Sequence, residues 1–109
     1  MDDALAGAVC WYSIIYTPPD RVDGVLAEIS RVVAASGLVL LAFQAGSGEG
    51  MVKADAHKTG MALTNYLHDV DDIARRLDGA GFGVHASTLR SPSLGHETSP
   101  QAFVIARKR

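Results

Sequence analysis

The stretch GAVCWYSIIYTPPD, residues 7–20, decides the fold of this chain. Residues 8–16 are small, β-branched or aromatic and show little alternation, which predicts a strand covered on both faces. The Thr-Pro-Pro that follows ends the strand, and we expect Thr17 to cap a helix with Asp20 as its acidic partner. Ligands of open α/β sheets lie beyond the carboxyl ends of parallel strands. Residues 11–16 therefore mark the expected ligand site.

A helix and a second strand are predicted next. The apolar residues fall at helical spacing: Val22, Val25, Leu26, Ile29, Val32 and Val33. Gly37 is expected to end the helix as a left-handed C-cap. Residues 38–43, LVLLAF, are apolar without alternation, which is typical of an interior parallel strand. Strand, helix and strand in this order make a right-handed crossover.

The remainder of the chain predicts one more helix and two strands. Residues 44–60 are polar and glycine-rich, so we expect a flexible loop, either a solvated connection or a substrate lid. Asp69 is placed to cap the second helix, which Gly81 ends. The other expected elements are an extended piece at 61–67, a strand at 82–89, a turn-rich segment at 90–100 and a strand at 102–106. The last two strands have no helix between them and should pair antiparallel.

The composition is that of a single globular domain, residues 1–109. The net charge of −2 gives no basis for binding nucleic acid or an anionic membrane. No apolar run approaches membrane-spanning length, and no basic segment with an apolar core opens the chain. The single cysteine rules out an internal disulfide, so a cytoplasmic setting is expected.

Reactive side chains give little evidence of a catalytic or metal site. Cys10 lies within the first predicted strand and is interpreted as a small packed hydrophobe. The four histidines lack metal-ligand spacing, so no metal is expected. Asp69, Asp71 and Asp72 suit the positive end of a helix dipole and are interpreted as structural.

The order of these motifs resembles the C-terminal half of class I S-adenosylmethionine-dependent methyltransferases. The resemblance rests on Trp-Tyr-Ser at a strand end, Thr-Pro-Pro at a helix start, Ala-Gly-Phe after the second helix and Phe-Val-Ile-Ala-Arg-Lys in the last strand. It implies an α/β fold with a partial Rossmann-like sheet. In the numbering of that family the strand order is 4-5-7-6, with the last strand antiparallel and two helices on one face.

The resemblance also implies a cofactor, S-adenosylmethionine, and a small-molecule methyl acceptor. It places Trp11, Tyr12 and Ser13 at the cofactor, although plain core packing is an equal alternative. The candidate substrate-binding residues are Tyr16, Tyr66 and His96. Relatives often carry histidine where this chain has Tyr16, and a phenol with a pKa near ~10 is a poor base at neutral pH. We name no catalytic residue, because methyl transfer depends mainly on alignment.

The main cofactor motif of that family cannot be placed in this sequence. The family binds its cofactor with a glycine-rich loop after the first strand, and the segment GSGEG at 46–50 follows a different strand. We therefore expect a truncated methyltransferase that is inactive without the N-terminal half. The alternatives are a non-catalytic interaction module or truncated gene product, and an unrelated compact α/β protein.

The implied fold also predicts an incomplete surface. With both helices on one face, Val9, Leu40 and their neighbours must meet water or a partner on the other, and the first strand has an open edge. We expect a homodimer, or a complex with a complementing chain, through that face or edge.

Overall fold

A computed structural model describes residues 5–53, 63–93, 95 and 97–109 of the chain. Its main sheet has four strands in the order β1–β2–β6–β5. β1 and β2 are parallel, and β6 runs antiparallel between β2 and β5. This is the predicted order, 4-5-7-6 in family numbering, and it is confirmed. The strands are β1 Leu5–Trp11, β2 Val33–Gln44, β5 Phe82–Arg90 and β6 Gln101–Lys108.

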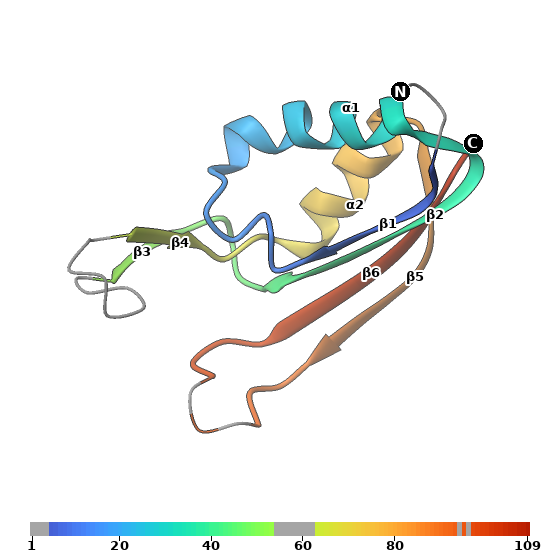
Figure 1. Ribbon diagram of the computed structural model, residues 1–109. Helices are drawn as coiled ribbons and strands as arrows, with labels where there is room; N and C mark the ends of the chain where they lie inside the picture. The colour runs from blue at the N-terminus through green and yellow to red at the C-terminus, as the bar shows by residue number, and fades with distance from the viewer. Residues whose placement is uncertain (1–4, 54–62, 94, 96) are drawn as a thin grey trace.

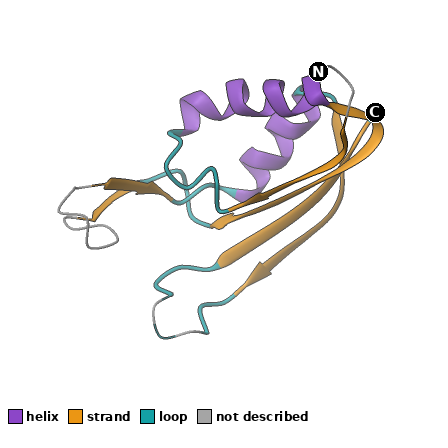
Figure 2. Ribbon diagram, in the orientation of Figure 1, coloured by secondary structure: helices purple, strands orange, loops and turns teal. Residues whose placement is uncertain are grey.

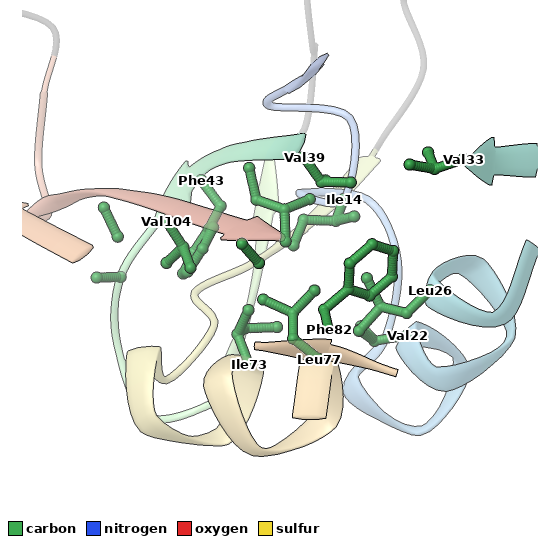
Figure 3. Close-up of a cluster of buried hydrophobic side chains, with 14 residues drawn as sticks. Ile14, Val22, Leu26, Val33, Val39, Phe43, Ile73, Leu77, Phe82 and Val104 are labelled. Atoms are coloured by element: carbon green, nitrogen blue, oxygen red, sulfur yellow. The ribbon is translucent and has the colours of Figure 1, made fainter. Parts of the chain in front are cut away.

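Two α-helices, α1 (Val22–Val32) and α2 (Val70–Gly79), cover the same face of the sheet, as predicted (Figure 1). A short 3-10 turn, η1 (Pro19–Arg21), leads into α1. The core lies between these helices and the sheet, where Leu26, Leu77 and Phe82 meet Val39 and Phe43 (Figure 3). Burial of this one layer is the main source of stability.

No helix among the described residues covers the opposite face of the sheet (Figure 1). Side chains alternate along β2, so that Val39, Leu41 and Phe43 are buried while Leu38 is exposed. On β1, which pairs with β2, the side chains of Val9 and Trp11 lie on the same face as Leu38 and are 69% and 59% exposed. The predicted exposure is confirmed at Val9, whereas Leu40, on the same face, is half-buried. The prediction that the first strand is covered on both faces is wrong, because both helices approach from one side.

The first strand is also shorter than predicted. β1 ends at Trp11 because Tyr12 adopts a left-handed backbone with φ 58°, which turns the chain out of the sheet. The expected cap at Thr17 is wrong as well. Pro18 occupies the position before η1, and no side chain caps that end.

The end of α1 is built differently from the prediction. The helix passes directly into β2, and Ser36, not Gly37, takes the left-handed conformation at φ 68°. Gly37 is required for close packing, since a Cβ there would lie 2.6 Å from Val33 Cγ1. The carbonyl of Val33 accepts a hydrogen bond from Lys108 Nζ at 2.7 Å, so β6 caps the end of the helix.

The signals for α2 are confirmed. The carboxylate of Asp69 accepts a hydrogen bond from the backbone N–H of Asp72 at 2.9 Å. Gly81, beyond the C-cap Ala80, has φ 99°. Glycine takes this conformation without a steric cost, which lets the chain enter β5.

The segment predicted as a continuous loop contains a strand. β3 (Gly50–Lys53) pairs antiparallel with β4 (Leu63–Tyr66), which corresponds to the extended piece expected at 61–67. This hairpin is separate from the main sheet and lies beyond the ends of β1 and β2 (Figure 2). Residues 54–62 lie outside the described residues, so the lid interpretation stays a prediction.

Candidate functional site

The carboxyl end of β1 carries the predicted Trp-Tyr-Ser motif. The Trp11 ring lies on the uncovered face, 5.8 Å from the Phe103 ring and 5.4 Å from the Tyr12 ring between centroids. Ser13 is exposed and Tyr12 is half-buried. The Tyr12 backbone N–H donates to the carbonyl of Ala42 at 2.8 Å, which holds the turn against β2. A bulky residue with positive φ is strained, and such strain is concentrated at functional sites.

A set of hydrogen bonds fixes the loop that follows this motif. The Ile14 carbonyl accepts from Thr17 N–H at 3.0 Å, and the Ile15 carbonyl accepts from Tyr66 N–H at 2.7 Å. The Ile14 side chain is buried in the core (Figure 3). The loop is therefore anchored on one side by the core and on the other by β4.

His68 joins the loops at this end of the sheet. Its ring Nε2 lies 2.9 Å from the Ile14 carbonyl, which can only accept, so Nε2–H is the donor. Its backbone N–H donates to the Gln44 carbonyl at 2.9 Å, and its own carbonyl accepts from Gly46 at 3.0 Å. The side chain is 1% exposed and its ring lies edge-on to Phe43 at 6.0 Å. Sequence reasoning placed His68 only near the start of a helix.

Two of the three predicted substrate residues, Tyr16 and Tyr66, are among the described residues, and their side chains have different surroundings. Tyr16 is 40% exposed and lines a groove of about 670 Å3 along η1 and α1. The Tyr66 ring packs over Gly50, where a Cβ would lie 3.2 Å from Tyr66 Cε1. The backbones of the two tyrosines are brought close by the hydrogen bond between Tyr66 and Ile15. His96 lies outside the described residues.

An ion pair closes the connection between β5 and β6. The Arg90 guanidinium binds the Glu97 carboxylate through two hydrogen bonds, of 2.9 and 2.6 Å. The Glu97 side chain is only 6% exposed. The hydrogen bonds to Glu97 raise the pKa of Arg90, with a smaller contribution from the nearby Tyr12 phenol. Sequence reasoning missed this pair, which joins the two ends of the segment between β5 and β6.

A pocket of about 510 Å3 lies at the N-terminus of α2, and the sequence did not predict it. It is lined by hydroxyl, carboxylate and apolar groups, including Ser47, Asp71, Ser87, Thr88 and Leu89. Because β6 and β2 separate β5 from β1, this pocket is distinct from the Trp-Tyr-Ser motif.

The thiol of Cys10 behaves as predicted. Burial raises its pKa, and a hydrogen bond with Ser13 opposes that effect only in part. A raised pKa lowers the fraction of nucleophilic thiolate at neutral pH. Cys10 therefore serves in packing beneath the helices.

The described residues lack the features of a membrane span and of a metal site. They contain no helix long and apolar enough to cross a membrane. Across residues 5–53, 63–93, 95 and 97–109, no group of three or more histidine, cysteine, aspartate or glutamate residues is arranged to hold a metal ion.

Comparison with known proteins gives structural relatives only. No family model and no curated protein matches the chain. A solved S-adenosylmethionine-dependent methyltransferase from Methanosarcina mazei superposes with a TM-score of 0.80 at 13% identity over 98% of this chain. The 1,6-didemethyltoxoflavin N1-methyltransferase of Burkholderia thailandensis superposes with a TM-score of 0.75 at 18% identity over 99% of this chain. The magnesium protoporphyrin IX methyltransferase of Synechocystis superposes with a TM-score of 0.68 at 15% identity over 100% of this chain.

The likeness establishes the fold over part of these enzymes. The chain spans 60% of the Methanosarcina protein, 45% of the Burkholderia protein and 41% of the Synechocystis protein. At this level of identity the shared property is the methyltransferase-like α/β fold.

Proposed function

We propose that this chain is the C-terminal part of an S-adenosylmethionine-dependent methyltransferase that acts on a small-molecule acceptor. The observation that carries the proposal is the sheet order β1–β2–β6–β5, with antiparallel β6 inserted between two strands. Solved enzymes with this arrangement include one with bound S-adenosylhomocysteine and one with bound S-adenosylmethionine. Function belongs to the site and not to the fold, so the residues at the end of β1 are the ones to test.

These residues suit one wall of a cofactor site. Trp11 offers an exposed indole for stacking, Tyr12 a phenol and Ser13 a hydroxyl. Neither the pocket at the N-terminus of α2 nor the groove along α1 is lined by any of the three. The proposal therefore assigns the remaining wall to polypeptide outside the described residues.

The bound cofactor supplies an electrophilic methyl group on a sulfonium. The role of this chain is to position the reactants. The hydrogen bond from Tyr12 to Ala42 and the His68 contact with Ile14 hold the loop in one conformation before any ligand arrives. Alignment of this kind lowers the barrier without a dedicated acid or base. The raised pKa of Cys10 argues against that thiol as a nucleophile.

Trp11 is the only tryptophan of the chain, so its fluorescence reports on this site. We expect S-adenosylhomocysteine to change the emission and to bind with one site per chain in calorimetry. Trp11→Ala should weaken binding about tenfold or more, the loss of one stacking contact, with little change in melting temperature. Trp11→Phe, which keeps an aromatic ring, is the matched control.

Two outcomes would count against the proposal in different ways. If the Trp11→Ala variant binds S-adenosylhomocysteine as well as the parent chain does, the cofactor does not bind at the Trp-Tyr-Ser motif. If the parent chain binds no S-adenosylhomocysteine at millimolar concentration, the expected binding is wrong, and the chain is either a C-terminal part that needs the N-terminal half to hold the cofactor or a non-catalytic interaction module.

A further inference from the structure

The pocket at the N-terminus of α2 exists because a short helix covers a long strand. α2 has 10 residues and β5 has 9, which correspond to about 15 Å of helix and about 30 Å of strand. The helix therefore covers only part of β5 (Figure 1). Phe82, at one end of the strand, is fully buried, whereas Leu89, near the other end, is 61% exposed. Both elements begin and end within the described residues, so this mismatch does not depend on polypeptide before β1.

Two side chains of β5 face the pocket from the helix side of the sheet. Ser87 pairs with Val104 on β6, and the side chains of directly paired residues point to the same face. Leu89 pairs with Ala102 in the same way. Both partners are fully buried beneath the helices, so both β5 side chains point to that side as well. The volume of about 510 Å3 is that of a small-molecule site.

The charge at the pocket is negative. Of the described residues that line it, Asp69 and Asp71 are acidic and none is basic. Asp69 is engaged as the cap of α2, whereas Arg75 and Arg76 both bind Asp72. The Asp71 side chain is exposed, and no hydrogen bond or ion pair reaches its carboxylate within the described part of the chain. The pocket therefore holds one carboxylate that is free to bind a ligand.

The N-terminus of α2 does not make this pocket an anion site. A helix dipole places about half a positive charge at this end, which is less than the charge of two carboxylates. The backbone N–H of Asp72 is already bound by Asp69. An anionic ligand would meet two like charges here, and a cation would meet two opposite ones.

We propose that this pocket binds a small amine with an apolar body. The ammonium group donates hydrogen bonds to the Asp71 carboxylate and the Ser87 hydroxyl, which are acceptors from two different elements. The apolar body packs against Val70, Leu89 and Pro100. Because the pocket is distinct from the Trp-Tyr-Ser motif, this binding goes beyond the proposed methyl transfer and does not rest on it.

Three probes with one apolar body test the charge preference on the parent chain. Phenethylamine should bind with one site and a Kd of about 1 mM or tighter in calorimetry. Amide chemical shifts of the isotope-labelled chain should change at residues 45–47, 69–71 and 87–89. Phenethyl alcohol, which has no charge, should bind about fivefold more weakly or worse. Phenylacetate, which has the opposite charge, should show no measurable binding.

Two variants test the position of the ligand. Asp71→Asn removes the charge and should weaken phenethylamine binding about fivefold or more. Asp78→Asn makes the same change at the other end of α2 and is its matched control, with the affinity of the parent expected. Ser87→Phe fills the pocket and should abolish binding. Ser87→Ala leaves the space open, loses one neutral hydrogen bond and should bind only about threefold more weakly.

Circular dichroism establishes that each variant is folded. The proposal is overturned if phenethylamine shows no saturable binding at about 10 mM, or if phenylacetate binds as tightly. It is also overturned if the Asp71→Asn and Ser87→Phe variants bind phenethylamine like the parent chain. If a variant does not fold, the three probes and the shift changes on the parent chain still decide the result. None of these measurements involves S-adenosylmethionine, so their outcome is independent of the proposed function.

Discussion

At the residue scale, the candidate site depends on hydrogen bonds that fix the backbone and do not involve a ligand. Tyr12 holds a conformation that most residues avoid, and it does so because Ala42 accepts its N–H. His68 contributes a buried ring whose partner is the carbonyl of Ile14. These contacts leave the side chains of Trp11 and Ser13 exposed at a fixed position.

His68→Ala tests this support directly. The change removes a buried hydrogen bond, leaves the Ile14 carbonyl with only its bond from Thr17 N–H and opens a cavity beside Phe43. We expect the free energy of unfolding to fall by ~2–4 kcal/mol in chemical denaturation. His85→Ala, at an exposed position on β5, should change it by less than ~0.5 kcal/mol. Equal losses in the two variants would contradict the role assigned to His68.

At the scale of the elements, the two helices end in different ways. α2 ends through local signals, with Ala80 as C-cap and Gly81 in the left-handed region. α1 ends on a side chain from β6, since Lys108 donates to the carbonyls of Ser30 and Val33. The end of α2 is therefore determined by residues next to it in the sequence. The end of α1 forms only when β6 has folded against it.

Paired glycine substitutions in α2 should have opposite effects. Gly79 is helical and a Cβ there meets nothing within 4 Å, so Gly79→Ala should raise the free energy of unfolding by ~0.5–1 kcal/mol. Gly81 has φ 99°, and Gly81→Ala should lower it by ~1 kcal/mol or more. Thermal melts of both variants beside the parent measure the two shifts. A stabilised Gly81→Ala variant would show that this backbone is not strained.

The same distinction explains what could be predicted from sequence. Asp69 and Gly81 act within a few residues, so their patterns predicted the limits of α2 correctly. The end of α1 was wrongly placed at Gly37, because the real cap comes from Lys108, 75 residues further on. The contact between His68 and Ile14 spans 54 residues and left no local signal. The Trp-Tyr-Ser motif was expected at a strand end from the family resemblance, whereas the apolar run, which continues to Tyr16, placed the end of the first strand too late.

At the scale of the whole molecule, one face of the sheet remains apolar and uncovered. Val9, Leu38 and Ile105 are exposed on it, and Trp11 stands at its end. We therefore expect an environment-sensitive dye to bind this face.

Val9→Lys checks the uncovered face. Because Val9 is largely solvated already, we expect the melting temperature to move by only a few degrees while dye fluorescence falls. Leu41→Lys, on the helix side, buries a charge and should prevent folding. If Val9→Lys unfolds the protein as Leu41→Lys does, the face is covered in solution.

The position of β6 in the sheet has a consequence for biosynthesis. β6 follows β5 in the chain yet lies between β2 and β5, pairing with both. As the chain leaves the ribosome, β2 and β5 emerge without the strand that joins them, and each presents an unpaired edge. Among the described strands β5 pairs only with β6, so it can join β1 and β2 in the native sheet only after residues 101–108 are available. The sheet is completed from the middle, by insertion of a strand, and not by growth at an edge.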